Sequence, residues 1–477
     1  MPPKNLEEAI QAAGGNAANM LRNSRLGPYV YPVVPSEFSN WRDEQLAWQQ
    51  TCVLFSQSYH MTDLWIKGPD AIKLVSDTAI NSVAGWGVNR AKQFVCANYD
   101  GYAIGDGIIF YLDKKGDSSE LLLIGRPSMH NWVQFHAKKG NYKVEFERDE
   151  RSIQRIPGEP VNRRLYRYQV QGPTAYKVLE KLNGGPIPDV KFFHMDEITI
   201  AGRKVRCLRH GMSGAPGLEL WGPHEEREEI RVAIVEAGQE FGLKQVGSRA
   251  YATNTIESGW IPSELPAVYT GAKMKEFREY LPGSSYEAIA SIGGSYISDK
   301  IEEYYTTPYD LGYGFMTKFD HDFHGREALE KIAKEPKYKK FTLAWHGDDV
   351  TKIFASMFQK EELPFKYLDM PLTNYNAFSF DKVTKNGKMV GMSMFSSYTF
   401  NERSMLSLAV LDPRDVKLGD EVVLTWGEPN GGSNKPVVER HRQIDIRCTV
   451  SPIPYAAQAQ QTYASGWRTA AAKAANG

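Results

Sequence analysis

The segment His210-Gly211-Met212-Ser213-Gly214-Ala215-Pro216-Gly217-Leu218-Glu219-Leu220-Trp221 places three glycines in a turn that runs into a strand. Glycines in such a turn let the backbone approach a flat ligand closely. The strand carries Glu219, and a carboxylate that accepts two N–H donors suits the aminopyrimidine ring of a pterin. A tight hairpin with a solvated glutamate is the alternative. The segment therefore makes Gly217 and Glu219 candidates for cofactor binding, without deciding between the two readings.

Two further motifs follow in order along the chain. Residues 247–260 read Gly-Ser-Arg-Ala-Tyr-Ala-Thr-Asn-Thr-Ile-Glu-Ser-Gly-Trp, and residues 323–329 read Phe-His-Gly-Arg-Glu-Ala-Leu. With the glycine-rich turn they resemble the aminomethyltransferase family, which comprises the folate-binding T-protein of the glycine cleavage system and its demethylase relatives. Ala215 departs from the family, which usually has a glutamate there. The resemblance implies a three-domain α+β fold with a C-terminal β-barrel or sandwich domain, and tetrahydrofolate as cofactor.

One branch of that family resembles the chain nearly end to end, namely the tetrahydrofolate-dependent aryl O-demethylases acting on vanillate, 3-O-methylgallate or syringate. The shared stretches include residues 20–24, 29–34, 37–42, 124–126, 247–262 and 318–323. This likeness implies transfer of an aryl methyl group to N5 of tetrahydrofolate. The products would be a catechol-type acid and 5-methyltetrahydrofolate, in the catabolism of lignin-derived aromatic compounds.

The resemblance also implies roles for individual residues. Arg126 would anchor the benzoate carboxylate, and Tyr251 would lie at the oxygen that loses its methyl group. The remaining candidates are Tyr31 and His60 as catalytic residues, Tyr29 and Gln57 as substrate-binding residues, and Trp260 as a cofactor-binding residue.

Elementary chemistry supports the two central assignments. A planar carboxylate is best met by the bidentate fork of an arginine such as Arg126. Loss of the methyl group leaves a phenolate, whose basicity resembles that of a tyrosine side chain with a pKa of about 10. The hydroxyl of Tyr251 can therefore protonate it at little cost. The alternatives are a surface charge for Arg126 and aromatic core packing for Tyr29 and Tyr31.

Asp106 is the last catalytic candidate. It lies in Ile104-Gly105-Asp106-Gly107-Ile108-Ile109-Phe110, the counterpart of an Asp-Asp-Leu-Ile strand whose carboxylate sits by the reactive folate nitrogen in the glycine-cleavage branch. This chain keeps one acid and lacks its neighbour, which implies a different substrate. Capping of a turn is the alternative role for Asp106.

Bulk properties narrow the class of protein. A chain of 477 residues is too long for one hydrophobic core, and 42% hydrophobic with 24% charged residues is typical of a globular protein. The 57 basic residues balance 57 acidic ones, which argues against a nucleic-acid partner. Four scattered cysteines, no visible secretory signal and no long apolar segment favour a cytoplasmic protein without a membrane span. The oligomeric state stays open.

The pattern of elements predicts how the chain is divided. Short β-runs across 94–148 indicate a β-rich insertion, and strand-like runs across 338–452 with little helix indicate a separate β domain. The tail is expected to fray or to form a short surface helix. Residues 1–60 and 159–280 are predicted to form a discontinuous folate-binding α+β domain, and residues 61–158 a β-rich domain inserted into it. Residues 281–335 are predicted to be a connecting segment that contains the Gly-Arg-Glu-Ala-Leu turn. Residues 336–455 form the predicted C-terminal β domain, and residues 456–477 the tail.

The sequence lacks the motifs that would indicate a metal site or a nucleotide cofactor. His321 and His324 have no third ligand at suitable spacing, so surface or capping roles are favoured over a metal site. No phosphate loop or dinucleotide fingerprint is present, so ATP and NAD are not indicated. Demethylation of a sulfonium or N-methyl amino-acid donor is the second enzymatic hypothesis, and a non-catalytic folate-binding protein is the third.

Overall fold

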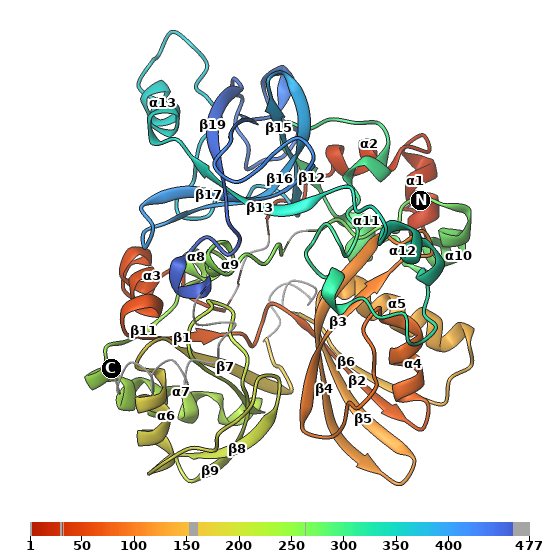
Figure 1. Ribbon diagram of the computed structural model, residues 1–477, viewed down its shortest axis with the longest axis vertical. Helices are drawn as coiled ribbons and strands as arrows, with labels where there is room; N and C mark the ends of the chain where they lie inside the picture. Colours follow the sequence, from red (N-terminus) through yellow and green to blue (C-terminus); the bar gives the residue numbers. More distant parts are fainter. Residues whose placement is uncertain (1, 29–30, 32, 152–160, 263, 461–477) are drawn as a thin grey trace.

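The computed structural model describes residues 2–28, 31, 33–151, 161–262 and 264–460. Three β-structures form its frame: a six-stranded sheet, a five-stranded sheet and a closed six-stranded barrel. Figure 1 shows the barrel above the two sheets, which lie side by side below it. The predicted α+β class is confirmed, and the C-terminal β domain is a barrel, not a sandwich.

The six-stranded sheet has the order β11-β1-β7-β10-β9-β8. Its strands are β1 (Cys52–Ser56), β7 (Leu165–Gln171), β8 (Met195–Ile200), β9 (Arg203–Leu208), β10 (Gly217–Pro223) and β11 (Leu243–Gln245). Only β1 and β11 pair in parallel, and the other pairs are antiparallel. The glycine-rich segment thus lies between β9 and β10 and leads Glu219 into the middle of the sheet.

Helices cover both faces of this sheet because β1 is apolar on both sides. Cys52 and Leu54 pack with α6 (Ala175–Asn183) and α7 (Arg227–Gly238). The alternate residues Val53 and Phe55 pack instead with α3 (Trp41–Gln50) and α8 (Ser248–Tyr251). Successive side chains of a strand point to opposite faces, so one strand joins two cores.

The five-stranded antiparallel sheet has the order β3-β4-β5-β2-β6. Its elements are β2 (Thr62–Gly68), α4 (Ala71–Thr78), β3 (Arg90–Ala97), β4 (Ala103–Lys115), β5 (Ser118–Gly125), α5 (Pro127–Lys139) and β6 (Glu145–Asp149). The β-rich prediction overlooked α5, a 13-residue helix, and placed the last strand at 142–146. Proline at the first helical position starts α5 directly after β5.

The barrel closes in the order β13-β17-β16-β15-β18-β19. Its elements are β13 (Lys339–Trp345), α13 (Gly347–Ser356), β15 (Asp381–Lys385), β16 (Lys388–Thr399), β17 (Ser404–Leu411), β18 (Glu421–Trp426) and β19 (Ile444–Ser451). All of its pairs are antiparallel. Full closure removes the edge strands that would otherwise expose unpaired backbone groups.

The amino-terminal helices pack away from the six-stranded sheet. Helices α1 (Leu6–Ala12) and α2 (Ala17–Asn23) share a core with α10 (Lys275–Tyr280), α11 (Tyr286–Ile289) and the five-stranded sheet. The sequence pattern predicted that residues 1–60 belong to the folate-binding domain together with residues 159–280. This boundary and the other predicted domain boundaries stay proposals. The remaining elements are α9 (Asn254–Ser258), β12 (Ile292–Gly293), α12 (Arg326–Ile332), β14 (Phe378–Ser379), η2 (His224–Glu226), η3 (Gln239–Phe241), η4 (Ala272–Met274), η5 (Ile301–Tyr304), η6 (Gly314–Met316) and η7 (Pro429–Gly431).

The start of the tail is helical over residues 457–460, one of the two outcomes expected for it, and one side of this turn packs against the protein. Ala456 is 2% exposed and Ala459 is 4% exposed. A Cβ atom placed on Gly214 would lie 2.8 Å from Cβ of Ala459, so the tail contacts the glycine-rich segment. Residues 461–477 lie outside the described residues.

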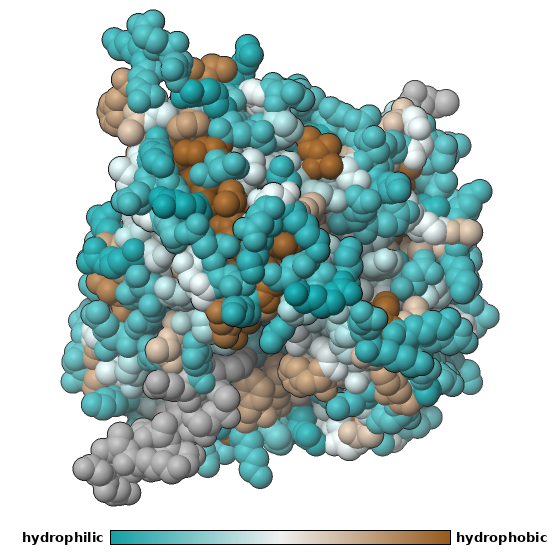
Figure 2. Space-filling view, turned by 45° about the horizontal axis from the view of Figure 1, so that its top comes forward, coloured by the Kyte–Doolittle hydropathy of each residue, from teal (hydrophilic) through white to brown (hydrophobic). Residues whose placement is uncertain are grey.

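Hydrophilic residues cover most of the face in Figure 2, with apolar residues gathered in a stripe near its middle. Phe315 and Phe358 are among the most exposed apolar side chains, at 72% and 87%. Within the described ranges, no helix has the length and apolar character needed to cross a membrane. The same ranges contain no cluster of three or more histidine, cysteine or acidic residues arranged to hold a metal, and the four cysteines are free and buried.

His324 stacks on His136 of α5, with ring centroids 3.7 Å apart. Burial and the neighbours His324 and Lys139 lower the pKa of His136 to about 2. The pKa of His324 is also lowered, mainly by burial. At neutral pH both rings are therefore uncharged in the folded protein, whereas an unfolded histidine takes up a proton below a pH of about 6.5.

Replacing His136 by phenylalanine is expected to flatten the loss of stability in acid. Between about pH 6 and pH 4 the unfolded wild-type chain holds one more proton at His136 than the folded one, so stability falls as pH falls. For each pH unit of acidification in this range, the free energy of unfolding of the variant should fall by about 1.4 kcal/mol less than that of the wild-type protein. Urea unfolding followed by circular dichroism at several pH values measures this, and parallel curves for both proteins would contradict it.

Candidate active site

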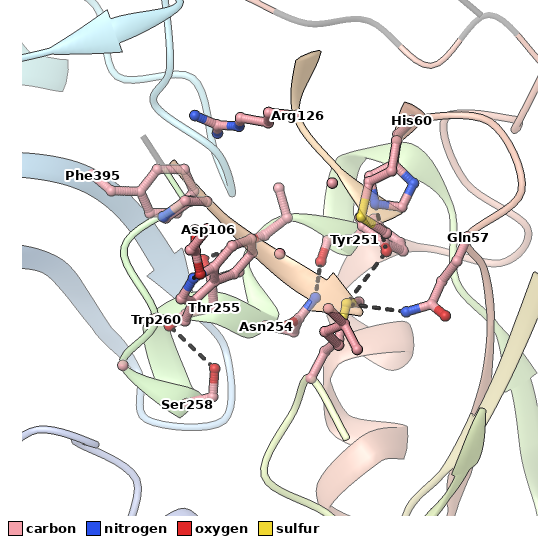
Figure 3. A pocket seen from close by; sticks show the side chains of 18 of the residues that line it. Gln57, His60, Asp106, Arg126, Tyr251, Asn254, Thr255, Ser258, Trp260 and Phe395 are labelled. Carbon is pink, nitrogen blue, oxygen red and sulfur yellow. Dashed lines mark hydrogen bonds between the residues drawn. The ribbon is translucent and has the colours of Figure 1, made fainter. Parts of the chain in front are cut away.

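A cavity of about 630 Å³ lies where the two sheets and the barrel meet. Its size is within the range of small-molecule sites, about 300–1,000 Å³. Figure 3 shows Tyr251, His60 and Gln57 on one side and Asp106 with Trp260 on the other. The predicted site residues that line the cavity are Tyr31, Gln57, His60, Asp106, Arg126, Glu219, Tyr251 and Trp260.

Tyr31, His60 and Tyr251 form one aromatic cluster in the wall. The ring of Tyr31 lies 5.1 Å from each of the other two, and those two lie 4.9 Å apart, between centroids. Oη of Tyr251 is 3.1 Å from Nε2 of His60. Helix α8 brings Tyr251 here because the edge of its ring packs on Phe55 of β1 at 5.5 Å. Tyr31 therefore lines the cavity and also packs against the core that contains Phe55 and Tyr251.

Burial fixes the protonation of this cluster. It lowers the pKa of His60 well below the usual value, and the nearby guanidinium groups of Arg167 and Arg163 lower it further. Burial also raises the pKa of the Tyr251 phenol. At neutral pH His60 is a neutral imidazole and Tyr251 keeps its proton, so the phenol can donate a hydrogen bond into the cavity.

Gln57 extends the cluster at the end of β1. Its Nε2 donates to Oε1 of Gln169 at 3.3 Å and to Sδ of Met212 at 3.1 Å. The hydroxyl of Tyr251 contacts the same sulfur at 3.5 Å. Oε1 of Gln57 has no hydrogen-bond partner among the described residues. Two hydrogen-bond donors therefore point to the same thioether sulfur. The side-chain carbonyl oxygen of Gln57 beside them can accept a hydrogen bond from a ligand.

Asp106 lies inside β4 and does not cap a turn. Its Oδ2 accepts three hydrogen bonds, from Nε2 of Gln93 at 2.7 Å, Nε1 of Trp260 at 3.0 Å and Oη of Tyr313 at 2.6 Å. Burial nevertheless raises the pKa of Asp106. These donors hold the carboxylate in place and direct Trp260, the predicted cofactor residue, to the same wall.

Glu264 is a second buried acid near Asp106. Burial and the charge of Asp106 raise the pKa of Glu264 to about 8. Lys340 lines the same wall, and burial lowers its pKa to about 8. Because two neighbouring carboxylates repel each other when both are ionised, the pair can hold a proton near neutral pH.

Arg126 stands between β5 and α5, at the wall of the cavity and not on the outer surface. Its Nη1 is buried and has no hydrogen-bond partner among the described residues. Burial opposes its charge, but Tyr286, Glu264 and Asp106 raise the pKa of Arg126. A charged guanidinium with an open donor is a site for an anion.

Glu219 faces the cavity from β10 and is only 3% exposed. Nη1 of Arg167 and Nδ1 of His210 lie 3.8 Å from its carboxylate oxygens. Both distances are too long for hydrogen bonds. The carboxylate therefore has neighbouring positive or polar groups but keeps its acceptor capacity for a ligand.

Two other predicted residues stand apart. Gly217 is absent from the cavity wall, and a Cβ atom there would lie 1.9 Å from the carbonyl oxygen of Val170. Its φ of 153° and this close contact show that glycine is needed for the pairing of β10 with β7. Tyr29 lies outside the described residues.

Unpartnered polar atoms gather around the cavity. Buried atoms of its wall that have no hydrogen-bond partner among the described residues include Gln57 Oε1, His60 Nδ1, Arg126 Nη1, His210 Nδ1 and Asn254 Oδ1. Leaving one such group unpaired costs about 1–3 kcal/mol. Because these atoms are concentrated at one cavity, they indicate a binding site for a polar ligand that forms hydrogen bonds with them.

Sequence reasoning did not identify several wall residues: Arg167, Met212, Asn254, Tyr313 and Lys340. Met212 and Asn254 stand inside the motifs of residues 210–221 and 247–260, so their position was the available signal. Tyr313 reaches Asp106 across 207 positions of the chain, and no local pattern indicates that contact.

Known proteins resemble the chain in sequence. A syringate O-demethylase of Sphingobium sp. strain SYK-6 is 47% identical over 98% of this chain and 99% of that protein. A sesamin methylene transferase of a Sinomonas species is 29% identical over 88% of this chain and 90% of its own length. An aminomethyltransferase of Thermoanaerobacter pseudethanolicus is 26% identical over 66% of this chain and 72% of that protein.

A solved structure and a family description complete the comparison. The crystal structure of the glycine cleavage system aminomethyltransferase T of Bartonella henselae covers 92% of this chain and 95% of its own, with a TM-score of 0.57 and 15% identity. This likeness shows the T-protein fold. The family described as the GCVT N-terminal domain matches residues 7–264. The chain therefore belongs to the GCVT family, as its three ordered motifs predicted.

Proposed function

We propose that this protein removes a methyl group from a methoxylated hydroxybenzoate and transfers it to N5 of tetrahydrofolate. One observation carries the proposal: the open guanidinium of Arg126 and the phenol of Tyr251 line the same cavity. The guanidinium suits the carboxylate of the substrate, and the phenol can donate a hydrogen bond to the ether oxygen. The identity of 47% to a syringate O-demethylase supports the same substrate class, with syringate, vanillate and 3-O-methylgallate as its candidates.

The chain offers groups that fit tetrahydrofolate. Glu219 is a buried carboxylate with open acceptors, which suits the paired N–H groups of a pterin. Trp260 is held by Asp106 at the same wall and offers an aromatic surface. When bound, tetrahydrofolate supplies the nitrogen that takes the methyl group.

The residues of the site perform the remaining tasks. Arg126 binds the carboxylate and thereby fixes the position of the ring. Tyr251 donates from Oη to the ether oxygen as negative charge develops there, and Nε2 of His60 steadies that hydroxyl at 3.1 Å. Asp106 uses only Oδ2 for its three protein donors, so Oδ1 would accept the N5–H proton that is lost as the methyl group is taken up. Positioning of both reactants contributes much of the rate.

The test measures methyl transfer directly. The pure protein is incubated with syringate, vanillate or 3-O-methylgallate, with and without tetrahydrofolate. One equivalent of demethylated acid and of 5-methyltetrahydrofolate should form only when both reactants are present. Release of methyl groups without tetrahydrofolate, or none from any of the three acids, would refute the proposal. Parallel assays with sulfonium and N-methyl amino-acid donors test the second hypothesis.

Glu219→Gln is expected to weaken tetrahydrofolate binding by about tenfold to 150-fold, because a charged acceptor is lost. Binding of the aromatic acid should change little. Calorimetric titration of both ligands measures the two affinities separately. Glu197→Gln, at an exposed position of β8, is the matched control. Equal folate affinity in Glu219→Gln and wild type would remove Glu219 from the folate site.

A further inference from the structure

Met212 lies where the two donors of the aromatic cluster converge. Its Sδ is 3.1 Å from Nε2 of Gln57 and 3.5 Å from Oη of Tyr251. Both donors and the sulfur belong to the cavity wall. Nε2 of Gln57 also contacts Oε1 of Gln169, at the longer distance of 3.3 Å. Oη of Tyr251 also lies 3.1 Å from Nε2 of His60. The thioether is therefore an acceptor that the protein itself offers both to Gln57 and to Tyr251, the donor assigned to the substrate oxygen.

The end of a methionine side chain resembles an aryl methyl ether. In each, a divalent acceptor atom carries a methyl group and a second carbon. The sulfur is the weaker acceptor, because a thioether accepts hydrogen bonds less well than oxygen does. A methoxy oxygen in the same position would therefore be the better partner for Tyr251 and Gln57.

The backbone around Met212 is anchored while its side chain has freedom to move. Oε1 of Gln171 accepts from the N–H of Met212 at 3.1 Å and from the N–H and Oγ of Ser213 at 3.2 and 3.0 Å. A methionine side chain is unbranched and has three rotatable bonds, so it adopts alternative positions easily. The side chain can thus leave the donors without disturbing the segment between β9 and β10.

We infer that Met212 is a specificity-determining residue whose thioether occupies the place of the substrate methoxy group and is displaced when the substrate binds. This inference rests on the proposed function and adds a role that neither Arg126 nor Tyr251 supplies. In the free protein the thioether of Met212 is an acceptor for both donors. Each methoxybenzoate must therefore compete with it, whereas an acid without a methoxy group gains less from displacing it.

Met212→Leu tests the inference, since leucine keeps the volume and removes the acceptor. The dissociation constants of syringate and vanillate are measured without tetrahydrofolate, so that no turnover occurs. Both should fall by about three- to tenfold, because the substrate oxygen then no longer competes with the thioether for the two donors. The affinity for tetrahydrofolate should stay the same. Met274→Leu makes the same change at a buried position outside the cavity and should bind as wild type.

A second measurement follows the side chain itself. The methyl groups of wild-type protein are labelled with ¹³C at methionine, and the Met212 signal is assigned from Met212→Leu or Met212→Ala. Addition of syringate should shift this signal. Equal or weaker syringate binding by a folded Met212→Leu, or an unmoved Met212 signal with syringate bound, would overturn the inference alone. Failure of wild type to bind any methoxybenzoate would overturn the proposed function with it.

Discussion

Replacing Arg126 by alanine is expected to lower kcat/KM for a methoxybenzoate by a factor of about 30 to several thousand. The carboxylate would then be buried without a charged partner, which typically costs about 2–5 kcal/mol. The structure supports this role because Nη1 of Arg126 is buried beside the cavity without a partner among the described residues. Arg126→Lys should restore only part of the activity, since an ammonium lacks the planar fork.

Steady-state kinetics with vanillate and syringate measure the loss. The corresponding benzamides provide the control, because they keep the methoxy group and lack the carboxylate. Wild type and Arg126→Ala should differ much less on the amides than on the acids. If the alanine variant kept the wild-type kcat/KM on the acids, the carboxylate would be bound elsewhere, and Arg167 and Lys340 would be the next candidates in the wall.

The sequence predicted those parts of the fold that have local signals. The glycine-rich segment between β9 and β10, the turn before α12 and the strands of the barrel each have a local pattern of glycines or alternating apolar residues. Helix α5 was overlooked because it lies within a long run of strand-like segments. Its buried positions Met129, Trp132, Val133 and Phe135 nevertheless have helical spacing, so the signal was present.

The candidate site was predictable only through motifs that lie in it. Arg126, Glu219 and Tyr251 stand in stretches that resemble the family, and all three line one cavity. Contacts between distant segments have no such signal. The hydrogen bond from Tyr313 to Asp106 and the one from Gln57 to Met212 join residues 207 and 155 positions apart, and only the tertiary fold brings these residues together.

Tyr251→Phe is expected to lower kcat by about 10²–10⁴-fold while both ligands still bind. Negative charge appears on the phenolic oxygen only as the methyl group leaves. A donor to that oxygen therefore stabilises the transition state more than the bound substrate, and its loss appears in kcat and much less in affinity. Burial raises the pKa of Tyr251, so its proton remains in place at neutral pH and the hydroxyl can donate a hydrogen bond to that oxygen.

Single-turnover rates with saturating syringate and tetrahydrofolate isolate the chemical step from product release. Phenylalanine keeps the ring that packs on Phe55, Tyr31 and His60, so the cluster should stay intact and only the hydroxyl is lost. Tyr31→Phe is the matched variant in the same cluster and should lower the rate much less. A normal rate for Tyr251→Phe would exclude its hydroxyl as the acid. A larger loss in Tyr31→Phe would transfer that role to Tyr31, whose ring lies 5.1 Å from that of His60.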